Sequence, residues 1–128
     1  MAHRPTETEE WLSDRVESWV DTYKKSMLTP VILAIVAAEQ PTGIARIAEA
    51  VTAETGWTVT ERGLYRTLKR LEDSGLLSTA EVDAPRTGAK RKELSLTRLG
   101  EGLLSGIRAN LVTVPDRTDQ GSDRARRR

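Results

Sequence analysis

One stretch, from Thr60 to Leu77, restricts the possible folds of this 128-residue chain more than any other. Its leucines at positions 64, 68 and 71 recur at spacings of four and three, which places them on one face of a helix. Thr60 suits the N-cap of that helix, and Gly75 suits the left-handed position that ends it. The face turned away from the leucines is basic and contains a tyrosine: Arg62, Tyr65, Arg66 and Lys69.

A short helix anchored by leucines, with cations on its outer face, suits the major groove of a duplex. Guanidinium and ammonium groups on that face reach phosphates and base edges. The same pattern also fits an ordinary core helix whose polar face is solvated. The helix alone therefore leaves both interpretations open.

Composition excludes several function classes. The chain has no Cys, which excludes disulfides and thiolate metal sites, and its single His, His3, cannot form an imidazole cluster. No phosphate-cradling glycine motif and no spaced set of carboxylates indicates an enzyme, so we expect no catalysis, cofactor or metal. No apolar run approaches the roughly 18 residues of a membrane span, and no secretory signal is visible, so we expect a cytoplasmic, nucleoid-associated protein.

Basic charge gathers in the second half of the chain. The formal net charge is only +1, but residues 1–60 carry −4, residues 61–92 carry +3 and residues 93–128 carry +2. A local basic patch can therefore act on a polyanion although the average is nearly neutral.

The N-terminal part predicts a long amphipathic helix. Residues 1–5 are expected to be disordered, and Thr6 with Glu9 has the spacing of a capping box that begins a helix over 6–26. We predict that this helix forms a dimer interface; packing back onto its own domain is the alternative. Its predicted interface residues are Trp11, Leu12, Val16, Trp19, Val20 and Tyr23.

Residues 27–97 predict a compact DNA-binding domain. A separate apolar helix is expected over 27–39 and another from Ile44 to Gly56, with Thr42 and Gly43 offering backbone N–H groups to a phosphate at its start. After Gly75 an alternating segment predicts a strand over 77–83, a Pro- and Gly-containing loop follows, and 93–97 predicts the returning strand. The cluster Lys90–Lys92 is placed at the basic turn of this hairpin.

The C-terminal part predicts a second dimerisation helix over 98–112, capped by Thr97, followed by a disordered basic tail over 113–128. Glycines within it cost about 1 kcal/mol each, which favours a tight helix–helix contact at Gly102 and Gly106; a frayed helix is the alternative. Its predicted interface residues are Leu99, Gly102, Leu103, Gly106 and Ile107.

Together these elements predict a mainly α (α+β) fold, a winged helix-turn-helix with added N-terminal and C-terminal dimerisation helices. The third helix of its core enters the major groove and the hairpin reaches the flanking backbone or minor groove. The predicted DNA-contacting residues are Thr42, Gly43, Thr60, Glu61, Arg62, Tyr65, Arg66, Lys69, Arg86, Lys90, Arg91 and Lys92.

The residues also resemble a known family over about Leu28 to Ile107. The pattern Leu64-Tyr65-x-x-Leu68-x-Arg70-Leu71-Glu72-x-x-Gly75-Leu76-Leu77, then Arg91-Lys92 and Leu96-Thr97-x-x-Gly100, resembles the compact subfamily of PadR transcriptional regulators. The resemblance implies a homodimeric repressor that binds double-stranded operator DNA, in some cases that of its own operon, and is released by a small-molecule effector. This chain has Thr42-Gly43 where the family usually has Tyr-Gly, and Glu93-Leu94-Ser95 where it usually has two tyrosines and a basic residue.

Two points stay open at the level of sequence. An aromatic effector bound by Trp11 and Trp19 is a speculative prediction, and aromatic filling of a dimer core is its alternative. A winged-helix module for protein–protein contact, without specific DNA binding, is the alternative function.

Overall fold

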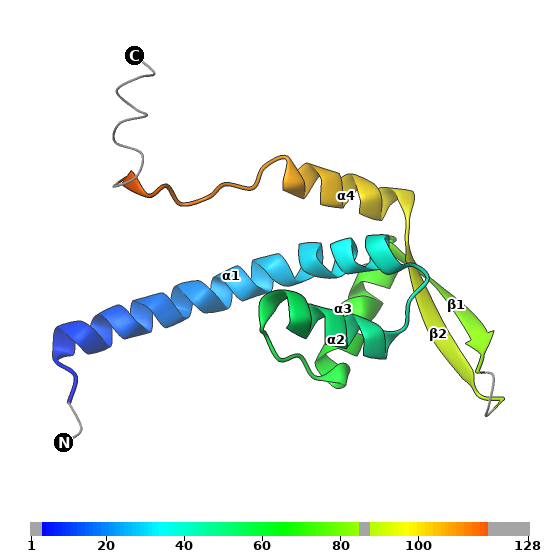
Figure 1. Ribbon diagram of the computed structural model, residues 1–128, viewed down its shortest axis with the longest axis horizontal. Coiled ribbons are helices and arrows are strands. Elements are labelled where there is room, and N and C mark those ends of the chain that lie inside the picture. The colour runs from blue at the N-terminus through cyan, green and yellow to red at the C-terminus, as the bar shows by residue number, and fades with distance from the viewer. Residues whose placement is uncertain (1–3, 85–87, 118–128) are drawn as a thin grey trace, which may run out of the picture.

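The computed structural model describes residues 4–84 and 88–117. This part of the chain contains four helices and a two-stranded sheet, in the order α1 (Glu7–Glu39), α2 (Ile44–Thr55), α3 (Glu61–Asp73), β1 (Leu77–Asp83), β2 (Lys90–Leu96) and α4 (Arg98–Arg108), and the hairpin projects from one end of the molecule (Figure 1). Helices α2 and α3 with the β1–β2 hairpin form the predicted winged helix-turn-helix. The predicted disordered segments 1–5 and 113–128 lie largely outside the described residues, so that prediction stays untested.

Helix α1 is a single helix of 33 residues, so the predicted division into helices over 6–26 and 27–39 is wrong. The predicted capping box is present, because the Thr6 hydroxyl accepts from the Glu9 N–H at 3.1 Å and Glu9 accepts from the Thr6 N–H. Pro30 lies inside the helix, where its missing N–H costs one hydrogen bond. The apolar positions stay in phase across it, from Tyr23 and Met27 before the proline to Val31 and Ala34 after it, and this continuous face favours one unbroken helix.

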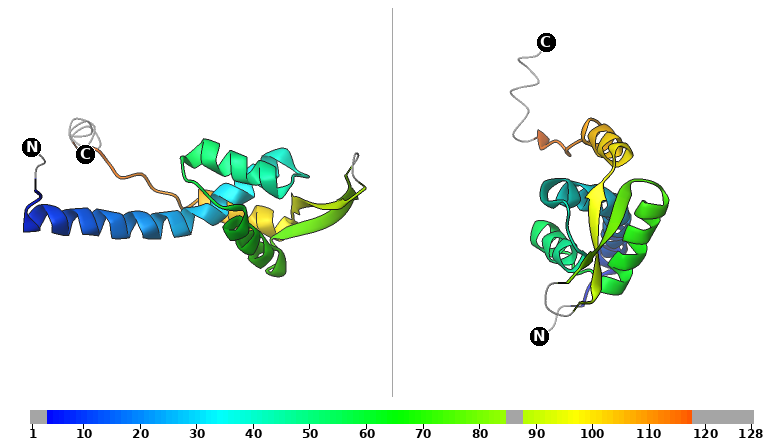
Figure 2. Two further views of the ribbon diagram at one scale, coloured as in Figure 1. Left: turned by 90° about the horizontal axis from the view of Figure 1, so that it is seen from below. Right: turned by 90° about the vertical axis from the view of Figure 1, so that its right-hand side faces the viewer.

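The two halves of α1 lie in different surroundings. The C-terminal half buries Pro30, Ile32, Leu33, Ile35 and Val36 in the core. Burying each such aliphatic side chain contributes about 1.5–3 kcal/mol, which outweighs the proline penalty of about 3 kcal/mol. The N-terminal half projects away from the domain as a rod, on the side opposite the hairpin (Figure 2). The predicted alternative, in which this half packs back onto its own domain, is therefore wrong for residues 11–19, which are all exposed.

The helix-turn-helix is held by a small aliphatic core. Leu64, Leu68 and Leu71 of α3 are each at most 4% exposed, as the leucine spacing predicts. Gly56 ends α2 at a φ of 76° and Gly75 follows α3 at a φ of 79°, and these positive values require glycine. The remaining core comes from α1, α2, the hairpin and α4: Ile32, Leu33, Ile35, Val36, Ile47, Ala50, Val51, Leu77, Leu94 and Leu104.

The hairpin pairs Leu77 with Leu96 at its base and Asp83 with Lys90 near its tip. The predicted start of the second strand at Glu93 is wrong, because the strand begins at Lys90 and the basic cluster lies in it rather than in a turn. Opposite charges face each other across the strands, Asp83 with Lys90 and Glu81 with Lys92, and such cross-strand pairs favour extending the ladder. The hairpin is fastened to the α1–α2 connection by Thr42, which exchanges two backbone hydrogen bonds with Leu94, at 3.0 and 2.8 Å.

Helix α4 returns beside the C-terminal half of α1 (Figure 1). Its predicted N-cap is confirmed, since the Thr97 hydroxyl accepts from the Gly100 N–H at 3.0 Å. The helix ends at Arg108, four residues before the predicted end, with Asn110 bonded back onto its last turn. The closest backbone approach is at Gly100, where a Cβ would overlap the Leu76 carbonyl oxygen, whereas a Cβ at Gly102 or Gly106 meets no atom within 4 Å. The predicted tight contact of Gly102 and Gly106 is therefore absent within the described chain.

Candidate nucleic-acid interface

The outer face of α3 is the most cationic exposed surface of the helix-turn-helix. Thr60 caps the helix by accepting from the Gly63 N–H at 3.0 Å, which fixes where the outward side chains begin. Arg62, Arg66 and Arg70 follow at intervals of four residues, opposite the buried leucines, and all three are exposed. Exposed guanidinium groups in a row on a short, well-anchored helix have the geometry that major-groove recognition needs.

Arg70 is the residue that the sequence reasoning missed. The acidic residues Glu72 and Asp73 follow it closely in the chain, but the ion pair described on this helix joins Lys69 Nζ to Asp73 Oδ1 at 3.6 Å, with both side chains exposed. The spacing of four residues between the three arginines could have been read from the sequence, because it places Arg70 on the same helix face as Arg62 and Arg66.

A second group of predicted residues lies on the flank of α3 that faces the hairpin. Tyr65 is 48% exposed, and Lys92 of β2 lies over its ring with 5.8 Å between Nζ and the ring centroid. Lys69 borders the same hollow as Tyr65 and Lys92. The structure therefore brings Tyr65, Lys69 and Lys92 together on this flank of α3.

The start of α2 differs from the prediction at one residue. Thr42 is only 5% exposed, and its N–H donates to the Leu94 carbonyl at 3.0 Å, so the prediction that it offers this N–H to a phosphate is wrong. Thr42 lies between α1 and α2 and forms a β-bridge with Leu94, so its backbone N–H is already hydrogen-bonded. Gly43 is the N-cap of α2 and has no side chain with which to cap it. Gly43 therefore lies at the start of α2, as predicted, and its proposed contact with a phosphate stays a prediction.

The basic residues of the hairpin alternate in direction along β2. Lys90 and Lys92 lie on one face of the strand and Arg91 lies on the other, and all three are exposed. Arg86 lies outside the described residues. The predicted hairpin cluster is therefore divided between two faces.

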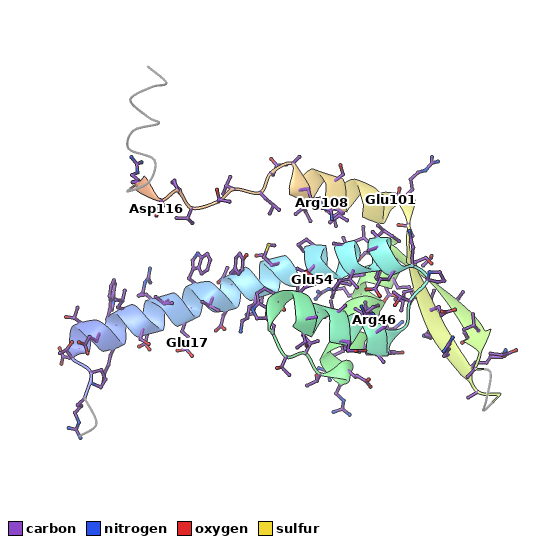
Figure 3. All side chains as sticks on the ribbon, in the orientation of Figure 1. Glu17, Arg46, Glu54, Glu101, Arg108 and Asp116 are labelled. Atoms are coloured by element: carbon purple, nitrogen blue, oxygen red, sulfur yellow. The ribbon has the colours of Figure 1, made fainter. Side chains whose placement is uncertain are left out.

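Arg46 joins the first turn of α2 to the end of α1 (Figure 3). Its Nε lies 2.6 Å from Glu39 Oε1, and its Nη2 lies 3.2 Å from Glu39 Oε2. This bidentate pair raises the pKa of Arg46 above its ordinary value, first through the hydrogen bond and then through the charge of Glu39. The pair fastens the first turn of α2 to the end of α1.

The predicted dimer residues are exposed, except Val20 and Ile107, which are half-buried. Trp11, Leu12, Val16 and Trp19 on α1 are 53–63% exposed, and Leu99 on α4 is 62% exposed. The predicted pair Trp11 and Trp19 is not brought together, because eight residues of helix separate them by about 12 Å. Trp19 instead stacks on Tyr23 with ring centroids 5.0 Å apart, and Tyr23 meets the edge of Trp57 at 6.1 Å.

Neither a metal centre nor a membrane span is indicated within residues 4–84 and 88–117. No group of three His, Cys, Asp or Glu side chains there could hold a metal ion. None of the helices in that part is both long and apolar enough to cross a bilayer.

The family model described as the transcriptional regulator PadR-like family matches residues 32–105, more than half of the chain. No match is found among curated proteins.

Solved structures of similar fold include three from different bacteria. A PadR-like transcription factor from Bacteroides fragilis is 29% identical with a TM-score of 0.60, and the match covers 72% of this chain and 86% of that one. A PadR family transcriptional regulator from Eggerthella lenta is 23% identical with a TM-score of 0.64, covering 78% and 85%. Bacillus subtilis PadR, solved in complex with operator DNA, is 22% identical with a TM-score of 0.60, covering 70% and 52%. The family match and the winged helix-turn-helix agree, and the chain belongs to the PadR-like family of transcriptional regulators.

Proposed function

We propose that this protein is a homodimeric repressor that binds a specific DNA operator through α3 and is released by a small-molecule effector. The observation that carries the proposal is the row of exposed arginines on a helix whose opposite face is fixed in the core. A structural neighbour, Bacillus subtilis PadR, was solved with its operator DNA, which supports the same mode of binding here.

The proposed roles follow from where each side chain lies. Arg62 and Arg66, on the outer face of α3, are placed to read guanine edges in the major groove, and Glu61 at its first turn borders them. Tyr65 and Lys69 are assigned to backbone phosphates, together with the N–H of Gly43. Lys90 and Lys92, which lie on one face of β2, are assigned to the backbone beside the groove.

The proposed dimer explains the exposed apolar surface. Leu99, Leu103 and Gly106 share one side of α4, and Trp11 to Trp19 extend along the projecting half of α1. Exposed contiguous apolar surface of this kind marks an interaction site. A second copy of the chain would cover it and present two α3 helices to successive turns of a duplex, about 34–36 Å apart.

A mobility-shift titration against DNA upstream of the gene tests this function. We expect Arg66→Ala and Tyr65→Ala each to weaken specific binding, by about 1–3 kcal/mol for a lost bidentate base contact and less for a phosphate contact. Lys25→Ala, which removes an exposed cation from α1, serves as the control and should bind like the wild type. If both substitutions bind like the wild type while circular dichroism shows the fold intact, the assignment of α3 is wrong.

The second candidate function is a protein–protein interaction module. It is favoured by the exposure of Trp11 and Trp19, at 63% and 60%, on a helix half that also carries many carboxylates. Repeating the titration at two salt concentrations separates the two functions. The affinity for specific DNA should fall steeply with salt, by roughly one order of magnitude for every two phosphate contacts between about 50 and 200 mM salt. A protein–protein module should show no specific DNA binding at either salt concentration.

A further inference from the structure

A cavity of about 620 Å³ lies between the start of α2, the hairpin-facing flank of α3 and β2. Its size falls within the roughly 300–1,000 Å³ of small-molecule sites. Ile44, Leu68 and Leu94 give it apolar walls, and the half-exposed ring of Tyr65 lies at its edge. This combination is too apolar and too large for a phosphate group alone.

The start of α2 gives the cavity a positive end. In α1, α3 and α4 a threonine hydroxyl caps the first turn, and each of these turns also contains a glutamate. In α2 the N-cap is Gly43, no side chain caps the helix and no acidic residue lies in its first turn. Residues 43–46 line the cavity, so the uncapped end of α2, with its positive helix dipole, borders it.

Charged and polar side chains reinforce this end. Lys92 lines the cavity from β2, and Arg46 and Lys69, which are paired with Glu39 and Asp73, line it from α2 and α3, against two carboxylates, Glu72 and Glu93. Its wall also contains Thr79, whose Oγ1 is buried without a hydrogen-bond partner in the described part of the chain. A buried hydroxyl without a partner is costly, and a ligand that brings an acceptor within reach of Thr79 would remove this cost.

From these features we propose that the cavity binds a small amphipathic anion, with its apolar body against Ile44, Leu68 and Leu94 and its anionic group at the start of α2. Such a ligand would occupy space beside Gly43, Tyr65, Lys69 and Lys92, which the proposed function assigns to the DNA backbone. Binding would therefore compete directly with DNA, a consequence that rests on the proposed function, whereas the ligand site itself does not.

Calorimetric titration of the full chain without DNA tests the site, with naphthalene-2-sulfonate as the probe. We expect the sulfonate to bind at least tenfold more tightly than either 2-naphthol, which lacks the charge, or sulfate, which lacks the apolar body. Equal affinity for the sulfonate and for either comparison compound would overturn the proposal.

A cavity-filling variant locates the binding. Ala45→Trp places a large side chain into the cavity from an exposed position on α2, and should weaken binding of the sulfonate at least tenfold. Ala53→Trp is the matched control, because it is exposed on the same helix and does not line the cavity; its affinity should equal that of the wild type. Circular dichroism checks that both variants fold. Unchanged binding by Ala45→Trp, or equal loss in both variants, would show that the probe binds elsewhere, for instance on the exposed face of α1.

The competition is tested separately. If the wild type binds DNA, naphthalene-2-sulfonate should weaken that binding in proportion to its occupancy of the site, and should fail to do so for Ala45→Trp. Sulfonate binding without any DNA binding would refute the proposed function but leave the ligand site standing. DNA binding that is unaffected at a saturating concentration of the bound probe would refute the competition.

Discussion

Gly100 fixes how α4 is seated on the domain, and replacing it with Ala should destabilise the fold strongly. A Cβ there would overlap the Leu76 carbonyl oxygen and would lie 2.5 Å from Leu96 Cδ1. The obstacle is backbone on one side and a packed side chain on the other, so α4 itself must move.

The expected cost follows from the contacts that this movement disturbs. Overpacking costs about 1–3 kcal/mol. The Thr97 hydroxyl lies 2.6 Å from the Gly75 carbonyl oxygen, and the Thr97 N–H donates to the Leu76 carbonyl at 3.2 Å. Losing these two hydrogen bonds adds about 1 kcal/mol each, and the better helix propensity of Ala returns about 1 kcal/mol. We therefore expect Gly100→Ala to lower the free energy of unfolding by about 2–4 kcal/mol, which is roughly 7–15 °C in Tm.

Urea and thermal unfolding followed by circular dichroism measure this difference. Ser105→Ala is the matched control, because it introduces the same residue into α4 at an exposed position on the solvent side, and its stability should stay within about 0.5 kcal/mol of the wild type. A Gly100→Ala protein as stable as Ser105→Ala would refute the close approach of α4 to the end of α3.

Other substitutions test the cap of α4, the turn after α3 and the proposed dimer interface. Thr97→Ala removes the cap of α4 and the hydroxyl contact with Gly75, and should cost about 1–2 kcal/mol in urea unfolding; no loss would contradict the cap. Gly75→Ala forces a side chain into a φ of 79° and should cost about 1 kcal/mol, although the space for the methyl group is sufficient; a stabilised variant would contradict the left-handed turn. Gly106→Ala should leave the fold intact but raise the dimer dissociation constant in analytical ultracentrifugation, and an unchanged constant would remove Gly106 from the proposed interface. Trp19→Ser should shift the protein toward monomer in the same measurement, whereas an unchanged dimer would place the interface elsewhere.

Much of the fold follows from local sequence signals. Thr6, Thr60 and Thr97 were each predicted to cap a helix, Thr6 from its capping-box spacing to Glu9, and each cap is confirmed by its hydrogen bond. The glycines that follow α2 and α3 were predicted at the ends of these helices, and both have positive φ. Caps and left-handed glycines depend on neighbours within a few residues, which explains why they can be read from sequence.

The errors arose where tertiary packing overrides a local rule. A separate helix was predicted over 27–39, but burial of the residues that follow Pro30 holds one continuous helix together. Thr42 looked like an open helix start, yet its N–H is used by Leu94, a partner 52 residues away in the chain that no local pattern reveals. The cavity beside α3 was missed for the same reason, since its walls come from three separate parts of the chain.

The candidate interface was predicted as a set of residue types, and the structure divides that set. Arg62 and Arg66 share the outer face of α3 with Arg70, whereas Tyr65 faces the hairpin and Lys92 lies over its ring. Helical spacing predicts the first group directly. The second group needed the position of β2, which depends on the register of the hairpin and on the bridge to Thr42.

Hydroxyl-radical footprinting tests the central claim most directly. A duplex would first be selected from randomised sequences by binding to the full-length protein, and the footprint would then be recorded on both strands. If two α3 helices of a dimer enter successive major grooves, the protein should protect two patches whose centres lie about 10–10.5 base pairs apart, and Arg62→Ala with Arg66→Ala should remove both patches. A single patch, a footprint that the double variant retains, or no selected duplex at all would contradict the account.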